Sequence, residues 1–249
     1  MILRRVIAHF RKQEWTAIFL DFAIVVAGIL IAFQITEWNS ARRDHALEYE
    51  YLERLYVDLQ STFDAKERRA SWDETRKVQQ VFVLNALRSG KLADEDRETF
   101  ETGLAFFGFS SSFDIQWSTV EELQSTGAMN LIRDVGLRSR ILQFDSDLRR
   151  RKAIAENFLS SIYDYRQQLG DRYGVLNFRG ERDKVQLSYD FDALAADPGV
   201  ANILSQIDFL SRFRADLVKT TLIELDGLKA EIAEQLGLET GEAPQLGGR

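Results

Sequence analysis

The chain has 249 residues, a formal net charge of −7 at pH 7, and a hydrophobic content of 45%. This apolar content is sufficient for a folded core, which excludes a chain that is disordered as a whole. The sequence contains no cysteine, which excludes disulfides, thiolate metal sites and a cysteine nucleophile. The acidic balance argues against nucleic acid as a partner.

The N-terminal region contains an apolar stretch of the length that crosses a bilayer. Residues 15–35 include twelve Ile, Leu, Val or Phe, and as a helix they extend about 31 Å, close to the roughly 30 Å of a hydrocarbon core. On insertion scales the twelve contribute roughly −4 to −7 kcal/mol, whereas Asp21 costs at most ~3 kcal/mol. We therefore predict a transmembrane helix over residues 15–36, preceded by a cytoplasmic N-terminus over residues 1–14.

Two other interpretations fit this stretch less well. A core helix of a water-soluble protein is rarely apolar on every face over such a length. A cleavable signal peptide has a shorter apolar region followed by a small-residue cleavage site, whereas here the run passes into Gln34, Thr36 and Glu37. The pattern therefore favours a retained anchor.

The basic residues that flank the span predict its orientation. Four precede it within residues 1–14, and only Arg42 and Arg43 follow it closely. The positive-inside rule then places the N-terminus in the cytoplasm and the remainder of the chain across the membrane. Beyond the span we predict one extracytoplasmic domain over residues 37–239 and a flexible tail over residues 240–249.

One face of the predicted span is polar at both ends. Asp21 and Asn39 are 18 residues apart, or five full turns, and Gly28 and Ala32 lie on the same face. A Gly-x-x-x-Ala pair allows a second helix to approach closely, so these four residues form a candidate contact face for another membrane helix. In the alternative interpretation, Asp21 reaches towards the cytoplasmic headgroups and interacts with basic residues of the N-terminus.

Three segments resemble one family of proteins. They are "GILIAFQITEWN" at residues 28–39, with an acid seven residues before its glycine, "TVEELQSTGAMNLIRDVGLRSRILQF" at residues 119–144, and "DFDALAADPGVANIL" at residues 190–204. This combination resembles a family of bacterial single-pass inner-membrane proteins of unknown function. The resemblance implies a short cytoplasmic end, one inner-membrane anchor and a helical domain in the periplasm. It implies no reaction.

The rest of the chain has a helical period. Apolar residues recur every four positions between residues 47 and 63, and no proline or glycine separates this segment from the span. Whether that helix continues to Ser89–Gly90, a plausible stop, or breaks near Ser71 is left open. We predict an all-α fold, in which the transmembrane helix continues into an antiparallel, up-and-down helical bundle.

Local signals predict where several helices begin and end. Ser118 and Thr119, each followed three residues later by glutamate, form overlapping capping boxes. Gly127 is placed to end the helix that follows them. Asp134 is a candidate N-cap of a long helix, and Asp197–Pro198 is a cap followed by proline in the first turn of the last helix.

The sequence lacks the common motifs of catalytic sites. The only histidines are His9 and His45, and the chain has no H-E-x-x-H motif and no glycine-rich phosphate loop. Acidic clusters such as residues 94–96 lack the spacing of a calcium loop, and we interpret the basic run at residues 149–152 as solvated and paired with nearby acids. We therefore predict that the protein is not an enzyme and uses no metal or cofactor.

An aromatic loop at residues 106–117 is the remaining candidate for recognition. Phe113 and Trp117 in this loop are a possible ligand or docking surface, unless the loop simply folds over the end of the bundle and buries them.

Two binding roles follow from these features. We predict an accessory or scaffold protein, which docks an envelope partner through its bundle and its transmembrane face; this partner is a membrane protein or a second copy of the chain. The alternative is an extracytoplasmic ligand sensor, which would need a partner for output because residues 1–14 are too few for an output domain.

Overall fold

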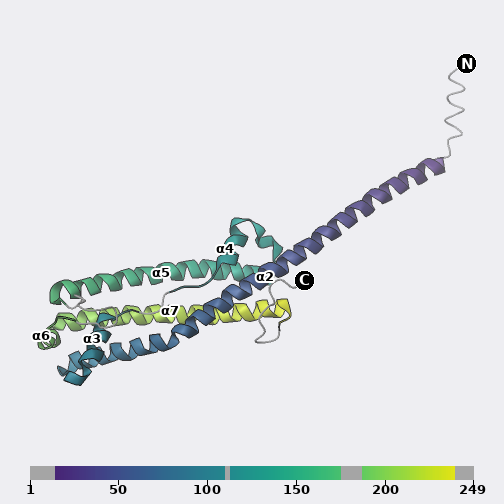
Figure 1. The fold of residues 1–249 in the computed structure, drawn as a ribbon. Coiled ribbons are helices and arrows are strands. Elements are labelled where there is room, and N and C mark those ends of the chain that lie inside the picture. The colour runs from purple at the N-terminus through teal and green to yellow at the C-terminus, as the bar shows by residue number, and fades with distance from the viewer. Residues whose placement is uncertain (1–14, 110–112, 175–186, 239–249) are drawn as a thin grey trace, which may run out of the picture. The chain divides into compact units, whose positions relative to one another are not determined.

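The computed structural model describes residues 15–109, 113–174 and 187–238, and every regular element in these ranges is helical. This result confirms the all-α prediction. The elements, shown in Figure 1, are α2 (Trp15–Ser89), η1 (Asp94–Asp96), α3 (Arg97–Ala105), α4 (Ser118–Ser125), η2 (Ala128–Leu131), α5 (Val135–Tyr173), α6 (Phe191–Ala196) and α7 (Pro198–Leu236). The predicted cytoplasmic end at 1–14 and the tail at 240–249 lie outside the described residues.

The chain divides into two compact units, Met1–Glu50 and Tyr51–Arg249. The described part of the first unit is the beginning of α2. This helix is long and apolar enough to cross a membrane, and no residue of its most apolar window is buried. Its exposed large apolar side chains are Phe19, Leu20, Phe22, Ile24, Val25, Val26, Ile29, Leu30, Ile31, Phe33, Ile35 and Trp38.

Water is a poor environment for this surface. Each large apolar side chain left in water forgoes roughly 1.5–3 kcal/mol of burial energy, so twelve of them together forgo more than the 5–15 kcal/mol that stabilises a typical domain. This length of α2 is therefore a candidate membrane span.

Helix α2 runs without a break from Trp15 to Ser89. The helix therefore does not break near Ser71, the point that the sequence left undecided.

The second unit is held together by two hydrophobic clusters, each built from α2, α5 and α7. The first cluster joins Leu55 of α2, Ile141 of α5 and Ile232 of α7. The second joins Val83, Ile162 and Ile207 of the same three helices. From one cluster to the other, residue numbers rise along α2 and α5 and fall along α7. Helices α5 and α7 are therefore antiparallel neighbours (Figure 1), whereas α2 and α5 run in the same direction.

This arrangement differs from simple up-and-down alternation because the segment between α2 and α5 crosses back along the bundle. Phe100 and Leu104 of α3 belong to the second cluster, and Val120 and Leu123 of α4 belong to the first. The segment thus returns the chain to the starting end before α5 begins. Short helices in this segment replace a fourth long one.

Most of the predicted helix boundaries are confirmed. Asp134 caps α5, accepting a hydrogen bond from the Leu137 amide at 2.9 Å, and Asp197 caps α7 by accepting one from the Gly199 amide at 2.6 Å. Gly90 and Gly127 follow α2 and α4 with φ of 63° and 72°, a left-handed conformation that glycine adopts without steric cost.

The predicted capping boxes at the start of α4 are wrong. The Thr119 amide and hydroxyl donate to Asp58 Oδ2 of α2 at 3.0 and 2.9 Å, and the Ser118 hydroxyl donates to the same oxygen at 3.0 Å. Glu122 instead forms an ion pair with Arg54 of α2. A carboxylate on a neighbouring helix replaces the local cap because a charged acceptor forms stronger hydrogen bonds than a hydroxyl.

We expect Asp58→Ala to lower the free energy of unfolding by about 1–3 kcal/mol, because the α4 N-terminus loses its cap and two hydroxyls lose their acceptor. Thermal unfolding of the full-length protein in detergent, followed by far-ultraviolet circular dichroism, measures this change. Glu67→Ala, at an exposed position of the same helix, is the control and should leave the transition in place. Equal transitions for the two variants would contradict the role assigned to Asp58.

Candidate ligand-binding groove

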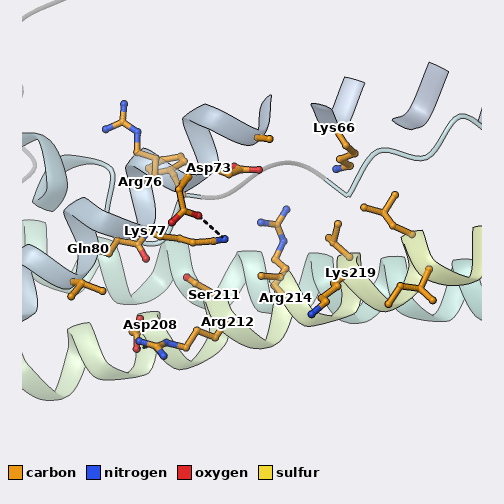
Figure 2. Close-up of a pocket in the computed structure, with 18 of the residues that line it drawn as sticks. Lys66, Asp73, Arg76, Lys77, Gln80, Asp208, Ser211, Arg212, Arg214 and Lys219 are labelled. Carbon is orange, nitrogen blue, oxygen red and sulfur yellow. Dashed lines mark hydrogen bonds and ion pairs between the residues drawn. The ribbon is translucent and has the colours of Figure 1, made fainter. Parts of the chain in front are cut away.

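A groove of about 910 Å³ lies between α2 and α7 within the second unit. Figure 2 shows side chains of both helices around it. Its lining consists of Phe63, Lys66, Ala70, Asp73, Glu74, Arg76, Lys77, Gln80 and Val81 from α2, Phe109 from the loop after α3, and Asp208, Ser211, Arg212, Arg214, Ala215, Val218, Lys219, Leu222, Ile223 and Asp226 from α7. The volume falls in the range of small-molecule sites, about 300–1,000 Å³.

The groove is elongated and amphipathic along its length. Its lining covers residues 63–81 of α2 and residues 208–226 of α7, and 18 residues of helix correspond to about 27 Å. The part that follows Arg214 along α7 is lined by the apolar Val218, Leu222 and Ile223 and by the charged Lys219 and Asp226. On the other side of Arg214, the α7 residues that line the groove are Asp208, Ser211 and Arg212, all of them polar or charged.

Positive charge exceeds negative charge along the groove, although the chain as a whole is acidic. The lining contains six lysines or arginines and four aspartates or glutamates, against a net charge of −7 for the protein. Two of the acids are paired within their own helix, Glu74 with Lys77 at 3.4 Å and Asp208 with Arg212 at 2.9 Å. The remaining lining charges therefore have a net positive sum.

Among the cations that line the groove, Arg214 is buried and Lys66 is half-buried. Arg214 is only 4% exposed, and its guanidinium extends from α7 towards α2, on which Lys66 and Asp73 lie (Figure 2). Burial lowers the pKa of Arg214, and the Asp114 and Asp73 carboxylates only partly oppose this effect. Burial likewise lowers the pKa of Lys66 despite the same two carboxylates.

Burial disfavours the charged forms of Lys66 and Arg214, and the nearby carboxylates favour them. Both cations line the same groove, and both interact with neighbouring groups of the protein.

The wall of the groove near Phe109 is fixed by a buried arginine. Arg166 of α5 donates to the carbonyls of Phe107 and Ala105, both at 2.6 Å, and its guanidinium lies 4.5 Å from the centre of the Phe109 ring. Burial lowers the pKa of Arg166 to about 10. A Cβ on Gly108 would collide with Ile207, so only glycine fits between this loop and α7.

On the α2 side of the groove, Arg76 contacts two aromatic rings. The guanidinium of Arg76 lies 4.0 Å from the centre of the Phe106 ring and 5.1 Å from that of Trp72. Phe106 in turn packs edge-on against Phe109, with ring centres 6.1 Å apart. The loop that follows α3 is therefore fastened to α2 as well as to α5.

The structure places Phe113 and Trp117 in the first hydrophobic cluster, 7% and 5% exposed. The Trp117 indole donates to Asp145 Oδ1 at 3.0 Å and packs on Phe144. Neither side chain faces the groove, so the structure does not bring them into a binding surface. The same loop does contribute to the groove, through Phe109.

Asp21, Gly28, Ala32 and Asn39 all belong to the first unit and are exposed on α2. A Cβ at Gly28 would meet no atom within 4 Å. The face that they share is therefore open to a neighbour over its whole length.

The sequence itself shows that Arg214 is unusual, because it falls at a position that the helical period of α7 assigns to the core. Buried positions recur along α7 every three or four residues, except for the seven residues between Arg214 and Thr221, and this stripe includes Leu204, Ile207 and Ser211. A charged residue in the register of the core is rarely buried unless it is paired. Lys66 offers no comparable signal, because lysine is common on exposed helix faces.

The basic run at residues 149–152 is largely engaged. Arg149 pairs with Asp145 at 3.0 Å and Arg150 with Asp147 at 2.8 Å, as predicted, whereas Arg151 crosses to Glu224 of α7 at 2.6 Å. Within the ranges that the structure covers, no group of three or more His, Cys, Asp or Glu side chains is arranged to hold a metal ion.

No protein-family model, no curated protein and no solved structure matches this chain. The resemblance to bacterial single-pass membrane proteins therefore stays a prediction.

We expect the Lys66 amine to titrate below the ordinary lysine pKa of 10.5, because burial disfavours its charged form. Its folded form then binds fewer protons than the unfolded chain, so its contribution to stability increases as the pH rises between the two pKa values. A pH titration of ¹³C-dimethylated lysines by NMR measures the shift, and Lys66→Gln assigns the signal. A Lys66 signal that titrates at 10.5 or above would contradict the burial described for it.

Proposed function

We propose that this protein is a membrane-anchored, extracytoplasmic ligand-binding protein whose helical domain holds its ligand in the groove between α2 and α7. The groove of about 910 Å³ with two enclosed cations is the observation that carries this proposal. Ligand sites in proteins are concave, mainly apolar and supplied with a few well-placed polar groups, and the groove has each of these properties.

The anchoring part of the proposal rests on the first unit. The exposed apolar length of α2 needs a non-aqueous neighbour, and a bilayer satisfies this need over residues 15–36. The basic residues before the span favour a cytoplasmic N-terminus. The second unit, which carries the groove, then lies in the periplasm of a bacterial cell.

Binding accounts for the groove better than catalysis does. The described lining residues include no histidine, and their one hydroxyl side chain, Ser211, is directed at the Gly108 carbonyl at 3.5 Å. Nucleophilic catalysis needs a nucleophile hydrogen-bonded to a base. Enclosed cations and an apolar wall instead favour recognition of a charged, partly apolar molecule.

A second candidate function is that of an accessory protein for a membrane partner. The open face of α2 formed by Asp21, Gly28, Ala32 and Asn39 favours it, because a carboxylate within an apolar span is stabilised by a donor on a neighbouring helix. The two proposals are compatible, since the groove lies in the second unit and the open face of α2 lies in the first.

We expect Ala215→Trp to abolish binding of a co-purified small molecule, because Ala215 lines the groove and an indole there fills the space. Native mass spectrometry of the full-length protein, extracted from membranes in mild detergent, compares the bound mass in wild type and variant. Ala153→Trp, at an exposed position of α5, is the matched control and should keep the bound mass. A wild-type protein without bound mass, or equal retention in both variants, would count against a ligand in this groove.

We expect Asp21→Ala and Gly28→Leu to abolish co-purification of a membrane partner, the first by removing the carboxylate and the second by blocking close helix approach. The readout is mass spectrometry of proteins recovered with the tagged chain in gentle detergent. Ile31→Leu, a conservative change in the same span, is the control. Recovery of the same partner by all three variants would favour an Asp21 that reaches the headgroups instead.

A further inference from the structure

We propose that the face of α2 around Asp21 binds the membrane helix of a different protein, and that this helix carries a lysine or arginine at the depth of Asp21. The inference rests on the second proposed function, that of an accessory protein in the membrane. It adds the chemical class of the partner, and it excludes a second copy of the chain at this face.

The helix that carries Asp21 does not satisfy its carboxylate. Side chains on a helix interact when they are three or four residues apart, and at these spacings from Asp21 the sequence has the apolar Ala17, Ile18, Ile24 and Val25. The Thr36 hydroxyl in the same span donates to the Ala32 carbonyl of its own helix at 2.9 Å. An ionised carboxylate cannot do this because it only accepts hydrogen bonds. Its donor therefore comes from outside the helix.

The membrane surface is too far away to supply that donor. Asp21 lies six residues inside the predicted span, which begins at residue 15, and six residues of helix correspond to about 9 Å. Lysine and arginine reach the headgroups from within a span through their long apolar stems, whereas aspartate has a single methylene. The carboxylate therefore stays within the span, where an ionisable side chain is stabilised by pairing with another group.

A second copy of the chain does not offer a suitable group. Two copies enter the membrane in the same orientation, so their spans are parallel and each places Asp21 at the same depth. Two carboxylates that face each other repel, and the repulsion is strong in a medium of low dielectric constant. A lysine or arginine at this depth instead donates hydrogen bonds and balances the charge. The partner at this face is therefore a different protein with a basic residue in its span.

The same face lets such a helix come close. Gly28 and Ala32 lie at nearly the same angular position as Asp21, and both are exposed. A Cβ at Gly28 would meet no atom within 4 Å. A helix that packs there brings its side chains within reach of the carboxylate, and the charge on Asp21 selects which helix binds.

Energy transfer between two charge-matched forms of the full-length chain tests the proposal. Asp21→Lys places a basic residue at the required depth, so this variant serves as the probe for the partner helix. The chain has no cysteine, so donor and acceptor dyes are attached at Ala41→Cys, an exposed position on the opposite side of α2 from Asn39. In phosphatidylcholine vesicles we expect wild type to pair with Asp21→Lys at least five-fold more tightly than with itself, which is the effect of a polar contact between membrane helices.

Matched controls locate the contact. Ala23→Lys carries the same charge at nearly the same depth but on the other side of the helix, and it should pair with wild type no more tightly than wild type pairs with itself. Gly28→Leu in both chains should weaken the mixed pair, because a larger side chain holds the helices apart. Ile31→Leu in both chains should leave the mixed pair unchanged.

A neutral variant gives an independent test should Asp21→Lys insert poorly. Asp21→Asn keeps the size of the side chain and removes its charge, and an amide both donates and accepts hydrogen bonds. We expect Asp21→Asn to associate with itself more tightly than wild type does, because the repulsion between equal charges is gone. Ala23→Asn, on the other side of the helix, should associate with itself no more than wild type does.

Four results would each overturn the proposal. Wild-type chains that pair with each other as tightly as with Asp21→Lys assign the face to a second copy. Equal pairing of wild type with Asp21→Lys and with Ala23→Lys removes the requirement for a basic residue on this face. A mixed pair that is indifferent to Gly28→Leu places the contact elsewhere on the helix. Absence of mixed pairing, with a membrane partner still lost from Asp21→Ala, refutes the basic partner and retains the accessory function.

Discussion

A charged residue in the buried stripe of α7 is the constraint on which the architecture of the second unit depends. Arg214 occupies a position that helical periodicity assigns to the core, and it is almost completely enclosed. A guanidinium cannot pack against apolar side chains without a large loss of hydration energy. The two hydrophobic clusters lie on either side of Arg214 along α7, and the groove between α2 and α7 lies at its level.

The rest of the second unit supports that groove. Arg166 holds the two carbonyls of the loop after α3 and so fixes Phe109 in the wall. Arg76 joins the same loop to α2 through its contact with Phe106. Three arginines from three different helices thus surround one segment of the bundle. In each case the cost of enclosing the cation is offset by carbonyls, aromatic rings or carboxylates.

Features of short range were predictable from the sequence. The caps at Asp134 and Asp197 and the glycine stop at Gly127 depend on contacts within three residues, and all three are confirmed. The capping boxes at Ser118 and Thr119 have the same kind of local signature but do not form, because Asp58 of α2 supplies a stronger acceptor from 60 residues away. The sequence pattern does not reveal a competitor so distant.

The aromatic loop illustrates the same limit for the candidate site. The composition of residues 106–117 marks the whole loop as aromatic, but nothing in the sequence separates Phe109, which lines the groove, from Phe113 and Trp117, which belong to the first hydrophobic cluster. That division depends on where Arg166 holds the backbone of the loop and on the partner that Asp145 offers to the Trp117 indole.

By itself the sequence determined the helical class, most helix ends and an apolar N-terminal helix long enough to cross a membrane, because periodicity, caps and composition act within one element. Only the tertiary structure decided that α2 and α5 run in the same direction and that Lys66 and Arg214 share one groove. These relations join residues on different helices, and their energies depend on burial and distance, which exist only once the helices have packed.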